Sequence, residues 1–137
     1  MPRLYLASQS PRRAALLQQI GVEFTQLPST IDEQRVPAET AIDFVRRLAR
    51  EKAAAGMALI NAENDAQAAV VLGADTIVVK DQRIFGKPQN EREYTNMLKH
   101  LSASWHQVLT AVSLLRIEPT AGPGEAGVEH FSTLSNT

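Results

Sequence analysis

The sequence predicts an α/β protein in which helices flank a mixed, twisted β-sheet. Short apolar runs typical of strands alternate with segments of helical periodicity, in the order β-α-β-loop-α-β-β-α-β-β. Strands joined through helices favour parallel neighbours, whereas strands joined by a short turn favour antiparallel pairing. With 137 residues and 44% apolar side chains, the chain is expected to form one domain, residues 1–137, with a sizeable core.

A short apolar run at residues 4–7 predicts the first strand, which leads directly into a helix. Ser10 and Pro11 are typical of the N-cap and of the first helical position. Apolar side chains then recur at helical spacing as far as Ile20, and Gly21 suits the position just beyond a helix C-terminus. A helix between Ser10 and Gly21 is therefore expected.

Residues 22–27 alternate in polarity and predict a second strand, and the polar stretch 29–37 predicts a surface loop. Thr40, with Asp43 three residues later, is typical of a helix start. The apolar stripe that follows predicts a second helix that ends between residues 56 and 60.

The near-continuous apolar run 70–79 predicts a buried strand. A turn follows it, which favours antiparallel pairing with a short strand at 84–85. A capping pattern at Asn90 predicts a third helix. Alternation and β-branched side chains predict a long strand over 106–115, and a last strand is expected over 128–133.

Composition excludes several classes of function. Fourteen basic and fifteen acidic residues leave a net charge of −1, and only 5% of residues are aromatic, which argues against a nucleic-acid-binding module. The absence of cysteine excludes disulfides, zinc–thiolate sites and thiol nucleophiles. The apolar runs are too short to cross a bilayer, and the N-terminus lacks the pattern of a signal peptide, so we expect a soluble cytoplasmic protein without membrane partners. The three histidines do not have the spacing of metal ligands.

The junction between the first strand and the first helix carries two hydroxyls and two guanidinium groups, from Ser8, Ser10, Arg12 and Arg13. An exposed arginine in the first turn opposes the helix dipole at a cost of roughly 0.3–1 kcal/mol. A bound anion reverses that effect, because helix N-termini bind phosphates well. The pattern therefore indicates a phosphate site, and a capped helix with two solvated arginines is the alternative that it leaves open.

Asp75 interrupts the most hydrophobic strand of the chain. A carboxylate there loses several kcal/mol of solvation unless it is paired, binds a metal or faces a cleft. A structural role, with the carboxylate accepting backbone hydrogen bonds, is the alternative. Lys52 falls in the apolar stripe of the second helix, where a lysine either extends to water or reaches a negative group.

Three further charged residues lie in loops or turns. Asp32 and Glu33 would supply a second carboxylate for a metal, although on their own they are ordinary loop acids. Lys87 stands between Gly86 and Pro88, which restrict the backbone, and by itself this is an ordinary turn with a solvated charge.

Six motifs that contain these residues occur in order along the chain: LASQSPRR (6–13), IDE (31–33), RLAREKA (47–53), GADT (73–76), GKP (86–88), and LS leading into HQVLTAV (101–112). Together they resemble the Maf family of nucleoside triphosphate pyrophosphatases over about residues 4–115. The resemblance implies a fold akin to that of the inosine triphosphate pyrophosphatases. Family members continue through further helices and strands past the strand that begins near residue 128, and nothing after Phe131 matches them, so the C-terminal part of the family fold is expected to be missing here.

The resemblance also implies roles for individual residues. Asp75 matches the proton acceptor, and Glu33 matches a second acid that would share a divalent cation, Mg²⁺ or Mn²⁺, with Asp75. Arg12 and Thr76 match positions tied to substrate choice and are similar to the branch that acts on dTTP and UTP. The positions that surround the phosphates in the family are Ser8, Ser10, Arg13, Lys52 and Lys87.

The expected partner is therefore a nucleoside triphosphate, hydrolysed to the monophosphate and pyrophosphate. The alternative is a non-enzymatic nucleotide-binding regulator of cell division, suggested by the missing C-terminal part and by the family's association with septum formation. An inert structural fragment, which would neither bind nor hydrolyse nucleotides, is a third interpretation. The oligomeric state is left open, with a homodimer as one alternative.

Overall fold

The computed structural model describes residues 3–34, 36–63, 68–81, 83–85, 90–101, 107–118 and 127–136. Its elements are β1 (Arg3–Ala7), α1 (Pro11–Gln19), β2 (Thr25–Leu27), α2 (Ala41–Glu63), β3 (Ala69–Lys80), β4 (Arg83–Phe85), α3 (Glu91–Leu101), β5 (Gln107–Glu118) and β6 (Gly127–Asn136). This order confirms the predicted mixed α/β class.

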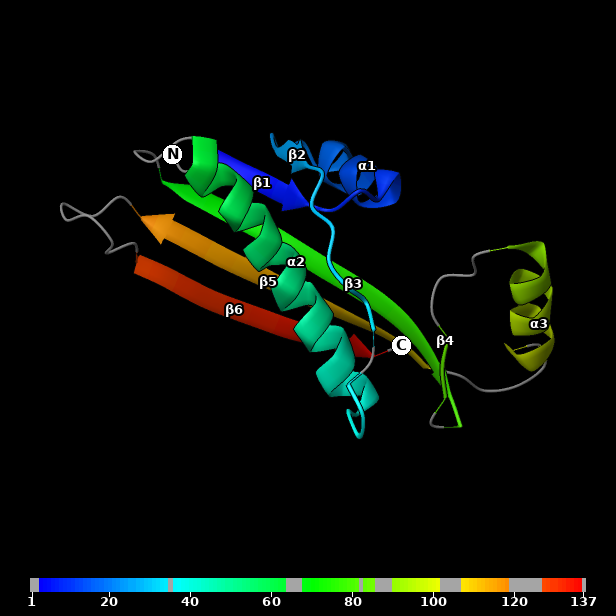
Figure 1. Cartoon of the computed structure of the whole chain (residues 1–137). Helices are drawn as coiled ribbons and strands as arrows, with labels where there is room; N and C mark the ends of the chain where they lie inside the picture. Colours follow the sequence, from blue (N-terminus) through cyan, green and yellow to red (C-terminus); the bar gives the residue numbers. More distant parts are fainter. Residues whose placement is uncertain are drawn as a thin grey trace.

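Six strands in the described part of the chain form one twisted sheet, in the order β2-β1-β3-β5-β6, with β4 paired to β3 (Figure 1). β1 runs parallel to β2 and to β3, as expected for strands joined through helices. β4 and β5 are antiparallel to β3, and β6 is antiparallel to β5. The predicted hairpin between β3 and β4 is thereby confirmed.

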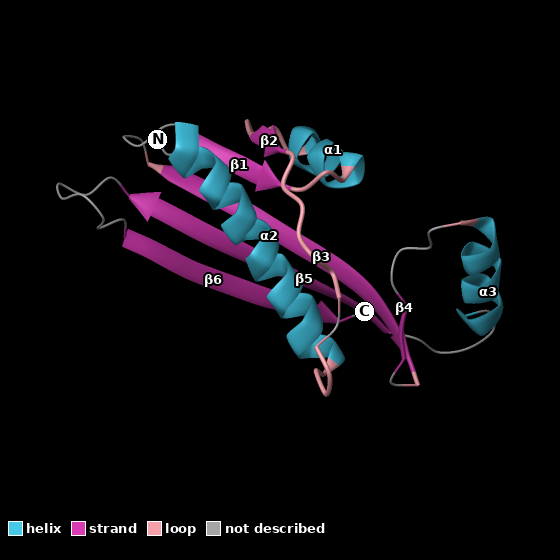
Figure 2. Cartoon of the chain, viewed as in Figure 1, coloured by secondary structure: helices cyan, strands magenta, loops and turns pink. Residues whose placement is uncertain are grey.

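Helix α2 crosses one face of the sheet diagonally, over β1, β3 and β5 (Figure 2). Side chains at alternate positions of β3 and β5 point toward it, and they form a core with the apolar stripe of the helix. One buried group contains Phe44, Val45, Leu48, Ala49, Ile77, Val79, Leu109 and Ala111. A second group contains Ala7, Ala53, Ile60, Val71 and Leu115.

Gly73 on β3 allows the middle of α2 to approach the sheet very closely. A Cβ atom at this position would lie 2.4 Å from the carbonyl oxygen of Ala49 and 2.6 Å from the backbone nitrogen of Ala53. Both atoms belong to the helix backbone and have no freedom to move aside, so only glycine fits without displacing the helix. Lys52 is thereby brought directly over β3.

Helix α2 is longer than predicted, and β2 is shorter. The expected end of α2 at residues 56–60 is wrong, since the helix continues to Glu63. Gly56 costs the helix about 1 kcal/mol relative to alanine, but the continuation buries Ile60 against the sheet, which offsets that cost. β2 begins only at Thr25.

The apolar faces of α1 and α3 are more exposed than their spacing suggests. Both helices start where predicted: the Ser10 side chain caps α1, and Asn90 Oδ1 accepts a hydrogen bond from the Glu93 backbone nitrogen at 2.9 Å. Ile20, however, is exposed, as are Tyr94 and Leu98 of α3. In Figure 1, α3 stands away from the sheet. No helix in the described ranges has the length and apolar character needed to cross a membrane.

Candidate functional site

Lys52 joins two carboxylates that come from distant parts of the chain. Its Nζ lies 2.7 Å from Oδ1 of Asp75 on β3 and 3.0 Å from Oε1 of Glu33 in the loop after β2. The side chains of Lys52 and Asp75 are only 17% and 11% exposed, whereas that of Glu33 is 56% exposed. The lysine in the apolar stripe thus reaches a buried acid rather than extending to water, and Asp75 is paired.

The position of Asp75 follows from strand periodicity. It lies on the same side of β3 as Gly73 and Ile77, the side that α2 covers, because alternate side chains of a strand point to the same face. Across the sheet it pairs with Ala111, whose small, buried side chain leaves room for the carboxylate.

Burial raises the pKa of the Asp75 carboxyl group, and this effect is larger than the lowering of the pKa by the neighbouring positive charges. The hydrogen bond and positive charge of Lys52 oppose the rise, the negative charge of Glu33 adds to it, and the charge of Arg13 opposes it weakly. A carboxylate with a raised pKa is a better proton acceptor than an ordinary aspartate. Perturbed acids of this kind are typical of functional sites, although structural pairs also produce them.

The junction between β1 and α1 is held by a set of short local hydrogen bonds. Ser8 is buried, and its Oγ accepts a hydrogen bond from the Ser10 backbone nitrogen at 3.1 Å. Oγ of Ser10 accepts from the Arg13 backbone nitrogen at 3.3 Å, as an N-cap does. Nε2 of Gln26 donates to the carbonyl oxygen of Ser8 at 2.7 Å and so connects β2 to the junction. The two serines therefore shape the start of α1.

Arg13 extends from α1 to the centre of the sheet. One of its guanidinium nitrogens donates to Oγ1 of Thr76 at 3.3 Å, and Thr76 Oγ1 lies 3.0 Å from Oγ1 of Thr110 on β5. Arg13 is thus directed toward the residue that follows Asp75, whereas Arg12 lies on the exposed side of the first turn. By the same periodicity Thr76 points to the opposite side of β3 from Asp75. Arg13 therefore lies beside this part of β3 and acts on the Asp75 carboxylate through its charge. No pattern in the sequence singles out Thr110 as a site residue.

Glu33 and Asp75 are the residues that would hold a divalent cation. Their carboxylates converge on one point, and carboxylate oxygens are the ligands that Mg²⁺ and Mn²⁺ prefer. The two carboxylates would therefore be suitable donors for such an ion. In the described residues no group of three or more His, Asp or Glu side chains is placed to hold a metal. The ammonium group of Lys52 contacts both carboxylates at their point of convergence.

Among the loop residues singled out in the sequence, Asp32 takes no part in this cluster. Asp32 accepts a hydrogen bond from the Gln34 backbone nitrogen at 3.0 Å and shapes the loop. Lys87, with Gly86 and Pro88, lies outside the described residues. The described site thus consists of the start of α1, Glu33, Lys52, Asp75 and Thr76.

Comparison with known proteins identifies relatives over almost the whole chain. A family profile described as "Maf-like protein" matches residues 3–136. A protein named dTTP/UTP pyrophosphatase from Alcanivorax borkumensis is 54% identical over 131 residues, which cover 95% of this chain and 62% of that protein. A second protein of that name, from Pseudoalteromonas translucida, is 44% identical over 133 residues, which cover 97% of this chain and 68% of the relative.

A dTTP/UTP pyrophosphatase from Escherichia coli is 50% identical over 114 residues, 83% of this chain and 55% of the relative. The chain thus spans between 55% and 68% of the length of these three curated relatives. Among solved structures, a dITP/XTP pyrophosphatase from Mycobacterium abscessus has a TM-score of 0.46 at 15% identity and covers 98% of this chain and 72% of that chain. At that level the likeness carries no inference.

Proposed function

The chain belongs to the family of Maf-like proteins, and we propose that it is a nucleoside triphosphate pyrophosphatase acting on dTTP and UTP. The names of relatives 44–54% identical to it support this activity and this choice of substrate. The observation that carries the proposal in this chain is the buried Asp75, with its raised pKa, beside Lys52 and near Arg13. A cytoplasmic location and a homodimer remain predictions.

In the proposed reaction, the triphosphate lies over the start of α1. The positive end of the helix dipole and the guanidinium groups of Arg12 and Arg13 offer positive potential to its oxygens. Lys52 adds a third positive charge from α2. Such fixed cations stabilise the charge that develops in phosphoryl chemistry, where positioning and electrostatics supply most of the rate.

The chemical step is attack by a water oxygen on the α-phosphorus. The bond from that phosphorus to the bridging oxygen breaks, pyrophosphate leaves with the bonding electrons, and Asp75 accepts the proton of the water. Lys52 holds Asp75 through Oδ1 and so fixes the direction of the carboxylate. A divalent cation on Glu33 and Asp75 would neutralise phosphate charge when bound.

Replacement of Asp75 tests this assignment. Asp75→Asn preserves the shape of the side chain but removes the proton acceptor, so we expect pyrophosphate release from dTTP and UTP to fall at least about 100-fold. Nucleotide binding, measured by calorimetry, should persist. Asp81→Asn is the matched control: Asp81 is exposed at the end of the same strand and has a φ of 51°, which asparagine tolerates.

Three outcomes of the same assay separate the interpretations. An Asp75→Asn protein that retains full turnover contradicts the proposed role of this residue. Tight nucleotide binding by the unaltered chain without pyrophosphate release, in the presence of Mg²⁺ or Mn²⁺, supports the regulator instead. Release that persists unchanged after chelation of divalent cations contradicts the proposed metal dependence.

A further inference from the structure

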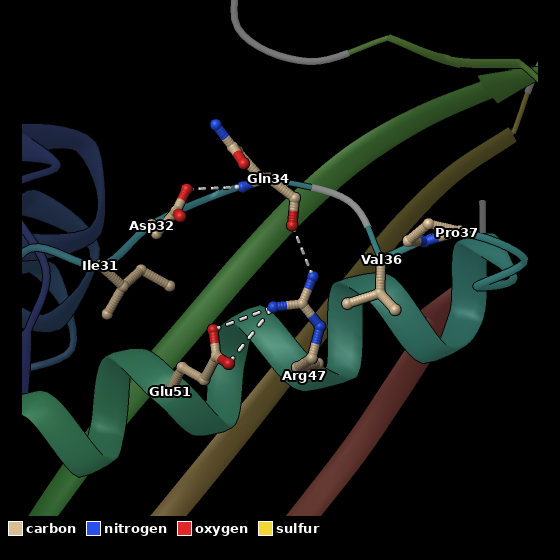
Figure 3. Close-up of a pocket in the computed structure, with 7 residues that line it drawn as sticks. All are labelled: Ile31, Asp32, Gln34, Val36, Pro37, Arg47 and Glu51. Atoms are coloured by element: carbon tan, nitrogen blue, oxygen red, sulfur yellow. Dashed lines mark hydrogen bonds and ion pairs between the residues drawn. The ribbon is translucent and has the colours of Figure 1, made fainter.

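We propose that Arg47 is a positioning residue that holds Glu33 in contact with Lys52. The effect that we expect of Arg47 on turnover rests on the proposed function, whereas its expected effect on the loop that carries Glu33 does not. Arg47 lies on α2, upstream of Lys52 on the same helix, and its side chain points toward the loop between β2 and α2 (Figure 3).

The guanidinium group of Arg47 makes as many hydrogen bonds as it has N–H donors. It donates to both carboxylate oxygens of Glu39, at 2.7 and 3.0 Å, and to both oxygens of Glu51, at 3.1 and 3.2 Å. The fifth bond goes to the carbonyl oxygen of Gln34, at 2.8 Å. Glu51 is on the same helix, whereas Glu39 and Gln34 belong to the loop, so Arg47 fastens the loop to α2.

The loop needs such a connection because the Glu33 contact is weak by itself. The Glu33 side chain is more than half exposed, and an ion pair in that setting adds little to stability. The pair between Arg47 and Glu39 is better shielded, since their side chains are 25% and 10% exposed, and it fixes the guanidinium group that makes the exposed bond to Gln34. Shielded, bidentate guanidinium–carboxylate pairs are stronger and more directional.

Glu33 lies between two anchors. On its N-terminal side, Ile31 packs against the apolar core beneath α2. On its C-terminal side, the carbonyl of the next residue, Gln34, is held by Arg47. With Ile31 and Gln34 both fixed to the α2 side of the molecule, the Glu33 carboxylate stays within reach of Lys52 although more than half of its side chain is exposed.

Direct phosphate binding by Arg47 does not fit its surroundings. All of its donors are used by protein acceptors. The pocket of about 550 Å³ that Arg47 helps to line also contains two acids, Asp32 and Glu51, beside Gln34 and apolar side chains, and the two acids disfavour an anion. Figure 3 shows the guanidinium group between Glu51 and the Gln34 backbone. Arg47 therefore acts through the loop.

Two substitutions test the connection. Arg47→Met removes all five hydrogen bonds, and Arg47→Lys keeps the charge but cannot bridge three partners with one ammonium group. In both, we expect hydrogen exchange at the Gln34 and Val36 amides to accelerate at least about 10-fold, while β3 stays protected. Glu39→Gln weakens the same network from the loop side and serves if Arg47→Met does not fold. Arg46→Met is the matched control, because Arg46 is an exposed arginine on the same helix.

Steady-state kinetics test whether Arg47 acts through Glu33. We expect Arg47→Lys to raise the KM for the metal–nucleotide complex about 10-fold and to change kcat little. The reason is that the substitution displaces Glu33, which is proposed to bind the metal and not to take part in the reaction. In a Glu33→Gln background the same substitution should have almost no further effect on KM. An equal rise in KM in both backgrounds, or unchanged exchange in the loop, overturns the proposal. If the unaltered chain releases no pyrophosphate, only the proposed function fails, and hydrogen exchange in the loop still tests whether Arg47 holds it.

Discussion

Replacement of Lys52 measures how strongly the buried carboxyl group of Asp75 depends on its ion pair with Lys52. Lys52→Met retains most of the length of the side chain but removes the ammonium group that lies 2.7 Å from the Asp75 carboxylate. Removal of one partner of a buried ion pair costs about 3–5 kcal/mol, because the other charge is left without compensation. The Lys52 side chain retains some exposure, and Asp75 can take up a proton, so we expect about 3 kcal/mol.

The double variant Lys52→Met/Asp75→Asn separates the pair from its individual members. At 2.7 Å and an effective dielectric constant of about 20, Coulomb's law gives roughly 6 kcal/mol of attraction, from which the desolvation of both groups must be subtracted. A coupling energy of about 2 kcal/mol is therefore expected. Since an uncharged pair leaves no buried charge without a partner, the double variant should be more stable than Lys52→Met alone.

The assay is urea denaturation followed by far-ultraviolet circular dichroism, at pH 7 with a chelator present, for the unaltered chain, both single variants and the double variant. Arg46→Met is the control for the loss of a positive charge from α2, and it should change the free energy of unfolding by less than about 0.5 kcal/mol. If the two single effects add to within about 0.5 kcal/mol, the groups are not coupled and the reasoning about Asp75 is wrong.

Two further predictions concern the same region. Gly73→Ala places a Cβ 2.4 Å from the Ala49 carbonyl oxygen and 2.6 Å from the Ala53 nitrogen, so α2 must move. We expect the free energy of unfolding to fall by about 1–3 kcal/mol and pyrophosphate release to fall in parallel. Gly21→Ala is the control: Gly21 has open space around it and a φ of 76°, so the substitution should cost about 1 kcal/mol and leave turnover intact. The raised pKa of Asp75 means that the folded protein favours its protonated form, so the stability that this residue contributes is complete below about pH 4 and is lost as the pH rises through the folded-state pKa. The difference in unfolding free energy between the unaltered chain and Asp75→Asn should therefore decrease over that range in chelator-treated samples, and a constant or increasing difference contradicts the shift.

Most of the fold could be predicted because its elements carry local signals. The apolar run at 70–79 became β3, extended by one residue at each end, and the Ser10 cap fixed the start of α1. The prediction fails at the end of α2, which the sequence places between residues 56 and 60 and the structure at Glu63. Gly56 packs against Ala7 and Val71 of the sheet. A glycine that packs against the sheet is a tertiary feature, and helical periodicity does not distinguish it from a terminus.

The candidate site was predicted only in part. Asp75 and Lys52 each stood out as a charge among apolar residues, but 23 positions separate them, and their contact depends on the close packing of α2 on β3 at Gly73. Arg47 gave a weaker signal, since an arginine with a glutamate four residues later on a helix is typical of a solvated surface. Its partners in the loop, Gln34 and Glu39, follow from a backbone path that no periodicity encodes.

A purely structural role explains the Asp75 cluster poorly. Buried ion pairs are often replaced by apolar side chains without loss of stability. For Asp75 and Lys52 the balance between desolvation and attraction is less favourable still, because burial together with the nearby charge of Glu33 raises the pKa of Asp75 despite the contact with Lys52. Ionisation of Asp75 therefore costs the folded protein stability relative to the protonated form. Sites that depart from the most stable choice are those where activity constrains the sequence. The double variant would then fold well and release no pyrophosphate, which separates what the cluster does for stability from what it does for chemistry.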